Sequence, residues 1–301
     1  MGRALVLLCL SGVAMMAAPV SAATLELEPA SEWRLRDYDD KSRMIRTFGD
    51  GEDAVTLWIE KAGAGRFINM TVIGRPFRSP YGTRVSLAFR PGDPISRGFV
   101  RSTSSKGRPV LTLFGVSAIS HDPEPIAEGQ EETVDLTATD ADGLAPEILS
   151  RRYDEVEAIE LSGALVQKVS LKSGGLGSMM AQLEQCAETL PGKRPNVSSG
   201  EGDKAQGASA RDAAAWAPQI QANYPAYLLR EMAQGTVGVR VQINPEGRAT
   251  FCEVREYTGP AGFNDAACLA MMRYSRFNPA RDGDGNPVWG TYSTRVTYRI
   301  N

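Results

Sequence analysis

The chain has 301 residues, a formal net charge of -3, 42% hydrophobic residues and 23% charged residues. This is ordinary globular composition, with room for one large or two modest domains. The near-balanced charge argues against nucleic-acid binding and provides no strong field toward an anionic membrane.

The first residues have the layout of a secretory signal peptide. A basic residue, Arg3, precedes an apolar run at residues 4–18, and small residues follow at Ala22 and Ala23. The apolar run is shorter than the roughly 20 residues that a membrane-spanning helix needs. The sequence therefore predicts a signal peptide at residues 1–22 and export, with an uncleaved inner-membrane anchor as the alternative.

Export would place the cysteines in an oxidising compartment, where they can pair. Cys252 and Cys268 fall in one compact predicted unit and are the favoured pair, which would stabilise the fold by ~3 kcal/mol. Cys186 is then left over or bridges to another chain. No CxxC motif or His/Cys cluster suggests a metal, and we expect none.

Short alternating segments separated by turn residues characterise residues 24–190. Residues 55–59 and 67–73 read as two strands, and the alternation continues through residues 132–143. Residues 176–190 then carry apolar side chains at helical spacing. The sequence predicts a β-rich domain at residues 24–190 that is closed by a helix.

The following segment has the composition of a linker. From Pro191 to about Arg211 it contains almost no bulky apolar residues and many Gly, Ser and Pro. Such a segment cannot bury enough surface to offset its ordering entropy. We expect a flexible linker at residues 191–217, which would span ~25 Å on average and ~70 Å when fully extended.

The last part of the chain predicts a small α/β unit. A short helix begins near Pro225 and stops at Gly235, a hairpin with one apolar side follows, and a second helix begins near Asn264. The final strand alternates through Tyr292 and Ile300. The predicted fold class is α+β: the β-rich domain with its closing helix, plus two helices on a three-stranded antiparallel sheet at residues 218–301.

This C-terminal unit resembles the C-terminal domain of TonB, the energy transducer of Gram-negative envelopes. The resemblance covers residues 218–301, and the order and spacing of the motifs make it specific. The matching motifs are Tyr224-Pro225-Ala226, Gly235 followed by alternating valines, Pro245-x-Gly247, Phe263-Asn264 and Phe277-x-Pro279-Ala280.

The resemblance implies a periplasmic, non-enzymatic binding protein without a cofactor, linked to transmembrane transport. In the family, this domain adds the TonB box of an outer-membrane receptor as a strand beside its last strand. The implied partner is a TonB-dependent receptor or another envelope protein. The implied partner-binding residues are Gln221, Tyr224, Tyr292, Thr294, Val296 and Tyr298.

The chain also departs from TonB itself. A transducer needs an uncleaved membrane helix and a long Pro-rich spacer across the periplasm. Here the sequence predicts a cleavable signal, a folded β-rich domain and a shorter linker. A soluble or envelope-associated binding protein that reuses the fold therefore fits better than a classical transducer.

Two alternatives remain at this point. An envelope hydrolase could use His121 in the β-rich domain, beside Ser120 and Asp122, although no G-x-S-x-G motif is present. A structural module could dimerise through the last strand or through Cys186.

The acidic run at residues 282–286 lacks the Gly and Glu of a calcium loop, so we expect a turn there.

Overall fold

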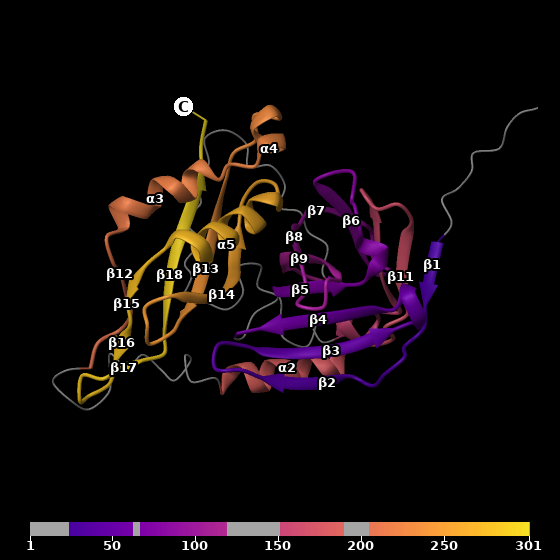
Figure 1. Ribbon diagram of the computed structural model, residues 1–301, viewed down its shortest axis with the longest axis horizontal. Coiled ribbons are helices and arrows are strands. Elements are labelled where there is room, and N and C mark those ends of the chain that lie inside the picture. Colours follow the sequence, from indigo (N-terminus) through magenta and orange to yellow (C-terminus); the bar gives the residue numbers. More distant parts are fainter. Residues whose placement is uncertain (1–23, 63–66, 119–150, 190–204, 301) are drawn as a thin grey trace, which may run out of the picture.

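The computed structural model describes residues 24–62, 67–118, 151–189 and 205–300. Within these ranges the chain has a sheet-rich N-terminal part and a smaller C-terminal part with helices on an antiparallel sheet (Figure 1), which confirms the predicted α+β class. The predicted signal peptide, the strand pattern at residues 132–143 and His121 lie outside the described residues. Within the described ranges, none of the helices has the length and apolar character needed to span a bilayer.

The N-terminal part contains a six-stranded antiparallel sheet in the order β2-β3-β4-β5-β9-β8. Its strands are β2 (Arg34–Asp37), β3 (Ser42–Phe48), β4 (Val55–Lys61), β5 (Ile68–Ile73), β8 (Val100–Thr103) and β9 (Pro109–Val116). Two short 3-10 helices lie between strands: η1 (Gly51–Asp53) precedes β4, and η2 (Arg75–Phe77) follows β5.

A five-stranded sheet in the order β1-β11-β10-β6-β7 completes this part. Only the β1–β11 pair is parallel. Its strands are β1 (Thr24–Leu27), β6 (Arg84–Arg90), β7 (Ile95–Gly98), β10 (Ala158–Gly163) and β11 (Lys168–Leu171).

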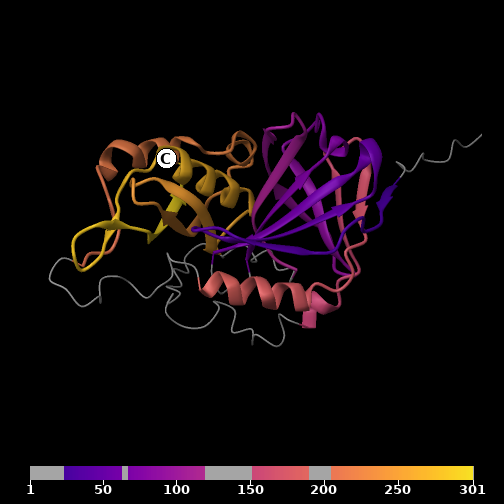
Figure 2. The same ribbon diagram turned by 60° about the horizontal axis from the view of Figure 1, so that its bottom comes forward.

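One hydrophobic core joins the two sheets and a helix. Leu57 of β4 and Leu87 of β6 are fully buried in it, and α2 (Gly177–Glu188) adds Met179 and Leu183 at helical spacing. Figure 2 shows α2 lying along the lower side of the six-stranded sheet. The N-terminal part is therefore β-rich and covered by a helix, as the sequence predicts.

The C-terminal part is built on a three-stranded antiparallel sheet in the order β14-β13-β18. Apolar residues of β13 alternate toward α5, which covers one face of the sheet, so the predicted hairpin and second helix are present. The elements are α4 (Ala226–Arg230), β13 (Gly235–Ile243), β14 (Ala249–Tyr257), α5 (Gly262–Tyr274) and β18 (Gly290–Tyr298). Two short pairs flank the sheet: β12 (Ser209–Ala210) with β15 (Phe277–Asn278), and β16 (Ala280–Arg281) with β17 (Pro287–Val288).

The predicted linker requires a correction. Residues 191–204 lie outside the described residues. The rest of the predicted linker is structured, because β12 lies within it and the helix α3 (Ala213–Ala222) begins within it and runs past its end. Trp216 anchors α3, because its ring lies 6.1 Å from that of Phe277 and its indole N–H donates a 2.8 Å hydrogen bond to the carbonyl of Arg211. The apolar anchors come after the polar stretch, so composition alone extended the linker too far.

The start of α5 also differs from expectation. The helix begins at Gly262 with Ala261 in the N-cap position, so Asn264 lies inside the helix rather than capping it. The Asn264 side chain is fully buried, against β9 of the N-terminal part near Gly115. Asn264 therefore lies at the contact between the two parts of the protein and does not cap the helix, although its residue type suggested a cap.

The two parts pack directly against each other. β14 contacts β5 and β9, and α5 contacts β7 and β9 (Figure 1). Because β14 is one edge of the C-terminal sheet, the N-terminal part covers that edge. β18 forms the opposite edge of the sheet.

Candidate functional site

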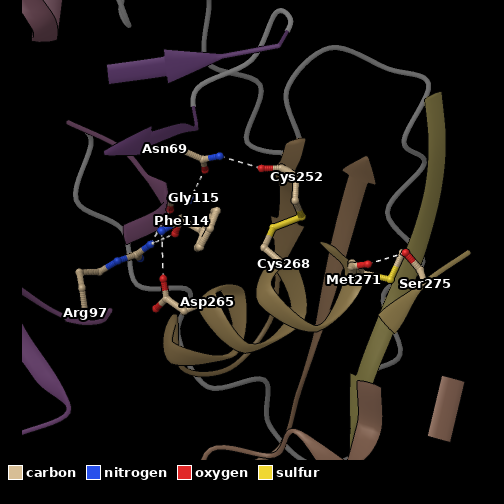
Figure 3. Close-up of a disulfide and its surroundings, with 9 residues drawn as sticks. All are labelled: Asn69, Arg97, Phe114, Gly115, Cys252, Asp265, Cys268, Met271 and Ser275. Atoms are coloured by element: carbon tan, nitrogen blue, oxygen red, sulfur yellow. Dashed lines mark hydrogen bonds between the residues drawn. A yellow bond between two sulfur atoms is a disulfide. The ribbon is translucent and has the colours of Figure 1, made fainter. Parts of the chain in front are cut away.

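A disulfide fixes the C-terminal sheet to its helix. Cys252 of β14 and Cys268 of α5 are bonded at 2.03 Å between sulfurs, with their Cα atoms 5.4 Å apart (Figure 3). Both cysteines are fully buried. Cys186 of α2 is unpaired, and burial raises the pKa of its thiol, which makes it a weak nucleophile.

Buried hydrogen bonds lie at the contact between the two parts. Arg97 of β7 donates from Nη2 to the carbonyls of Phe114 at 2.9 Å and Gly115 at 2.6 Å. The Phe114 N–H donates to Oδ1 of Asp265 in α5 at 2.9 Å (Figure 3). Burial raises the pKa of Asp265 to about 7, against the opposing effect of the nearby Arg97 guanidinium. These bonds hold the C-terminal domain in one orientation.

β18 forms the outer edge of the C-terminal sheet. β18 pairs with β13 along its whole length, from Gly290 opposite Ile243 to Tyr298 opposite Gly235. On its other side it pairs with no strand in the described part of the chain. An edge strand presents unpaired backbone N–H and C=O groups, which can accept a further strand.

A cavity of about 480 Å³ lies at the C-terminal end of β18. Gln221, at the end of α3, lines it together with Tyr224 and Tyr298, so the structure brings these three predicted partner-binding residues together. Thr297 and Arg299 complete the described lining, and neither was predicted. The cavity therefore lies beside one end of the β18 edge.

Tyr224 lines this cavity and is held in place by its neighbours. Its hydroxyl donates to the carbonyl of Ala233, and its ring meets those of Phe263 and Tyr298 edge-on, each at 5.4 Å. Phe263 and Tyr298 are themselves stacked at 4.7 Å. Burial raises the pKa of both tyrosine hydroxyls, so they stay protonated at physiological pH.

The other predicted residues of β18 point toward the helices. Val296 and Tyr298 are buried in the core, and the ring of Tyr292 packs against that of Phe277 at 5.1 Å. Thr294 shares this face and is half-buried. Their side chains therefore serve mainly to support β18, and what β18 can offer a partner is its backbone.

The opposite face of β18 carries side chains that the sequence prediction missed. These are Thr291, Ser293, Arg295 and Thr297, which are half-buried or exposed. The signal was present in the sequence, because residues of alternating parity in a strand face opposite sides. Arg295 pairs with Glu256 across the sheet, with 2.7 Å between Nε and Oε1.

The acidic run at residues 282–286 forms a turn. Oδ1 of Asp282 accepts hydrogen bonds from the N–H groups of Asp284 at 3.0 Å and Asn286 at 2.8 Å, which lowers the pKa of the carboxyl. Among the residues that the structure describes, no cluster of His, Cys, Asp and Glu could hold a metal ion.

Residues 220–300 match the family of the Gram-negative bacterial TonB protein C-terminal domain. The fold of this region, with helices on a three-stranded antiparallel sheet, agrees with that match, and the region is a TonB C-terminal-like domain. Such domains are non-enzymatic, contact outer-membrane receptors and are linked to envelope transport. Comparisons with curated proteins and with solved structures found no match.

Proposed function

We propose that this protein binds an extended segment of an outer-membrane TonB-dependent receptor in the periplasm, by adding it as a strand beside β18. The observation that carries the proposal is the asymmetry of the C-terminal sheet. The N-terminal domain covers β14, whereas β18 lacks a partner strand within the described part of the chain. In the C-terminal sheet, β18 is therefore the edge at which a further strand could be added.

Backbone hydrogen bonds would provide most of the attraction in such a complex, because every second residue of an added strand can bond to the edge. Side chains of the added segment would alternate between the two faces. On one face they would lie beside the polar row of Ser293, Arg295 and Thr297. At the end of β18, the cavity beside Gln221 can take one side chain and so set the register.

The contact between the two parts of the protein favours binding, because it restricts the motion of the C-terminal sheet that carries β18. The disulfide joins β14 to α5, and Asp265 ties α5 to the N-terminal domain. A rigid edge loses less conformational entropy on binding than a mobile one. The binding unit is therefore the whole described body and not a C-terminal domain on a long tether.

Isothermal titration of the full-length protein with a receptor peptide that carries a TonB box tests the proposal. We expect saturable binding, and we expect the same peptide with N-methyl groups at alternate residues to lose at least about tenfold in affinity. Methylation removes the backbone donors but keeps the side chains. Equal binding of both peptides, or no heat from TonB-box peptides of several receptors, would overturn the proposal.

A matched pair of variants tests the position. Gln221→Ala removes a side chain that lines the cavity, and we expect it to weaken binding by about three- to tenfold. Gln219 lies on the same helix and donates to the carbonyl of Ala215 at 3.1 Å, outside the cavity lining. Gln219→Ala should leave the affinity unchanged. The same loss in both variants would contradict binding at this end of β18.

Self-association through β18 is the competing use of this edge. Sedimentation of the full-length protein with and without the peptide separates the two. A monomer that binds the peptide supports receptor binding. A dimer that the peptide does not disrupt would overturn it.

A further inference from the structure

A second hollow lies away from β18, where the outer face of the six-stranded sheet meets the C-terminal domain. It has a volume of about 620 Å³, within the range of small-ligand sites, which often form between domains. Side chains of β3, β4, β5 and β9 line it, with the β8–β9 turn on one side. Thr250 and Phe251 of β14 and Met272 of α5 line it from the C-terminal domain. No described residue of β18 belongs to this lining.

The charge of this groove is strongly one-sided. Four cations, Lys41, Arg43, Lys106 and Arg108, line it against a single carboxylate, Glu60. That carboxylate is already paired, because Oε1 of Glu60 accepts hydrogen bonds from Nε and Nη2 of Arg43 at 2.8 and 2.6 Å. Lys41 is also paired, with 3.1 Å between its Nζ and Oδ2 of Asp40. Lys106 and Arg108 therefore supply the positive charge that no described carboxylate offsets. A hollow lined by one sign of charge concentrates ligands of the opposite sign. The groove is therefore suited to an anionic ligand.

The cations are held against aromatic rings. The guanidinium carbon of Arg43 lies 3.9 Å from the centre of the Trp58 ring, and Nζ of Lys41 lies 5.2 Å from the centre of the Phe251 ring. Such contacts help to hold both side chains in place and leave the aromatic rings beside the groove. Because Lys41 and Phe251 belong to different domains, the docked arrangement of the two domains completes this part of the groove.

Hydroxyl groups provide the remaining polar lining. Eight of the lining residues are Ser or Thr, and the hydroxyls of Thr71 and Thr112 lie 3.1 Å apart on the sheet. A hydroxyl can both donate and accept a hydrogen bond, so such a surface matches a ligand that carries many hydroxyls of its own. Aromatic side chains beside them offer apolar faces.

We propose that this groove binds a short acidic oligosaccharide. The carboxylates of the sugar would meet Lys106 and Arg108, its hydroxyls would exchange hydrogen bonds with the Ser and Thr side chains, and its ring faces would lie against Trp58 or Phe251. The combination of cations, hydroxyls and aromatic rings favours a carboxylated sugar over an acidic peptide. This proposal does not depend on strand addition at β18.

Titration of the full-length protein with trigalacturonate, trimannuronate and neutral galactotriose tests the class of ligand. We expect at least one acidic trisaccharide to bind, with an affinity that falls as salt is added, and galactotriose to bind at least about tenfold more weakly. Hexaglutamate provides the peptide comparison. No heat from either acidic sugar would overturn the proposal, as would hexaglutamate or galactotriose binding as tightly as the acidic sugars.

Variants place the sugar in the groove. Lys106 lies on the exposed turn between β8 and β9, so Lys106→Ala should fold normally and weaken trisaccharide binding by about three- to tenfold. Lys172→Ala is the control, because Lys172 follows β11, is partly accessible to solvent and lies outside the groove lining. Equal affinities of the two variants would overturn the assignment.

The aromatic contribution is tested with Trp58→Phe, which keeps a ring, and Trp58→Ala, which removes it. We expect Trp58→Ala to lose more affinity than Trp58→Phe, after circular dichroism has confirmed that both fold. If Trp58→Ala does not fold, Trp58→Phe combined with Lys106→Ala should still reduce sugar binding about tenfold, and unchanged binding would overturn the proposal. Neither Lys106→Ala nor Trp58→Phe should alter TonB-box peptide binding. A failure of sugar binding in the groove can therefore be told apart from a failure of peptide binding at β18.

Discussion

The side-chain amide of Asn69 in β5 donates a 2.7 Å hydrogen bond to the backbone carbonyl of Cys252 in β14. The amide oxygen of Asn69 also accepts a hydrogen bond from the N–H of Gly115 at 3.3 Å. One buried side chain thus ties the strand that carries the disulfide to the six-stranded sheet. Through the disulfide to Cys268, this contact also restrains α5.

Asn69→Ala should lower the free energy of unfolding by about 1–3 kcal/mol, because it leaves the Cys252 carbonyl and the Gly115 N–H buried without a partner. Urea unfolding followed by tryptophan fluorescence measures this. Asn278→Ala is the control, since its exposed amide only donates to Ser209 at 3.2 Å and its loss should cost less than about 0.5 kcal/mol. Similar losses in both variants would contradict the role of Asn69.

Gly115→Ala should be more destabilising than Gly107→Ala. Both glycines have positive φ, +61° and +75°, so both variants incur the backbone cost of a left-handed alanine. Only at position 115 would the new Cβ also meet a neighbour, 2.8 Å from Cβ of Val254. We expect an additional loss of about 1–3 kcal/mol at position 115 in thermal and urea unfolding. Equal losses would show that β9 and β14 are not in close contact.

Replacing Cys252 and Cys268 together by alanine should lower the free energy of unfolding by about 3 kcal/mol, because the bond closes a loop with a sequence separation of 16. Chemical denaturation with and without a reductant measures the change. Cys186→Ala controls for the removal of a thiol and should change stability little. If a reductant leaves the wild-type midpoint unchanged, the bond does not contribute in solution.

Asp265 should make stability depend on pH. Its pKa is raised to about 7 in the folded protein, above its ordinary value of 3.8, so the folded state holds the proton more tightly than the unfolded state. Its contribution is therefore fully present below about pH 4 and is lost as the pH rises to about 7, with a slope approaching 1.4 kcal/mol per pH unit for about one proton.

The neutral variant Asp265→Asn keeps an acceptor for the N–H of Phe114 and should flatten the dependence on pH between about pH 4 and 7. Urea unfolding at a series of pH values compares the two proteins. A wild-type slope that survives in Asp265→Asn would assign the titration to another group.

The C-terminal sheet was predictable from sequence because its signals are local. Alternation through Val237, Val239 and Val241 specified one buried face, and helical spacing after Phe263 specified the covering helix. The family match at residues 220–300 covers these elements. The helix α3 was missed because one tryptophan and one isoleucine, Trp216 and Ile220, are too few to mark a helix within an otherwise small and polar stretch.

The candidate site was only partly predicted, because the residues of one parity in β18 were chosen and those of the other parity were not. The predicted set on β18 is the set that faces the helices, and Thr291, Ser293, Arg295 and Thr297 face the other side. Gln221 and Tyr224 were placed near the strand by resemblance, and both line the cavity at its end.

The sequence by itself determined the α+β class, the C-terminal sheet with its helices and the pairing of Cys252 with Cys268, because these depend on residues close together in the chain. Only the tertiary structure decided which sheet edge is covered, how Asp265 is buried beneath Arg97 and how the groove beside Trp58 forms. These features join residues far apart in the chain, on separate domains. Their contact depends on the shape of two folded surfaces, which no local pattern encodes.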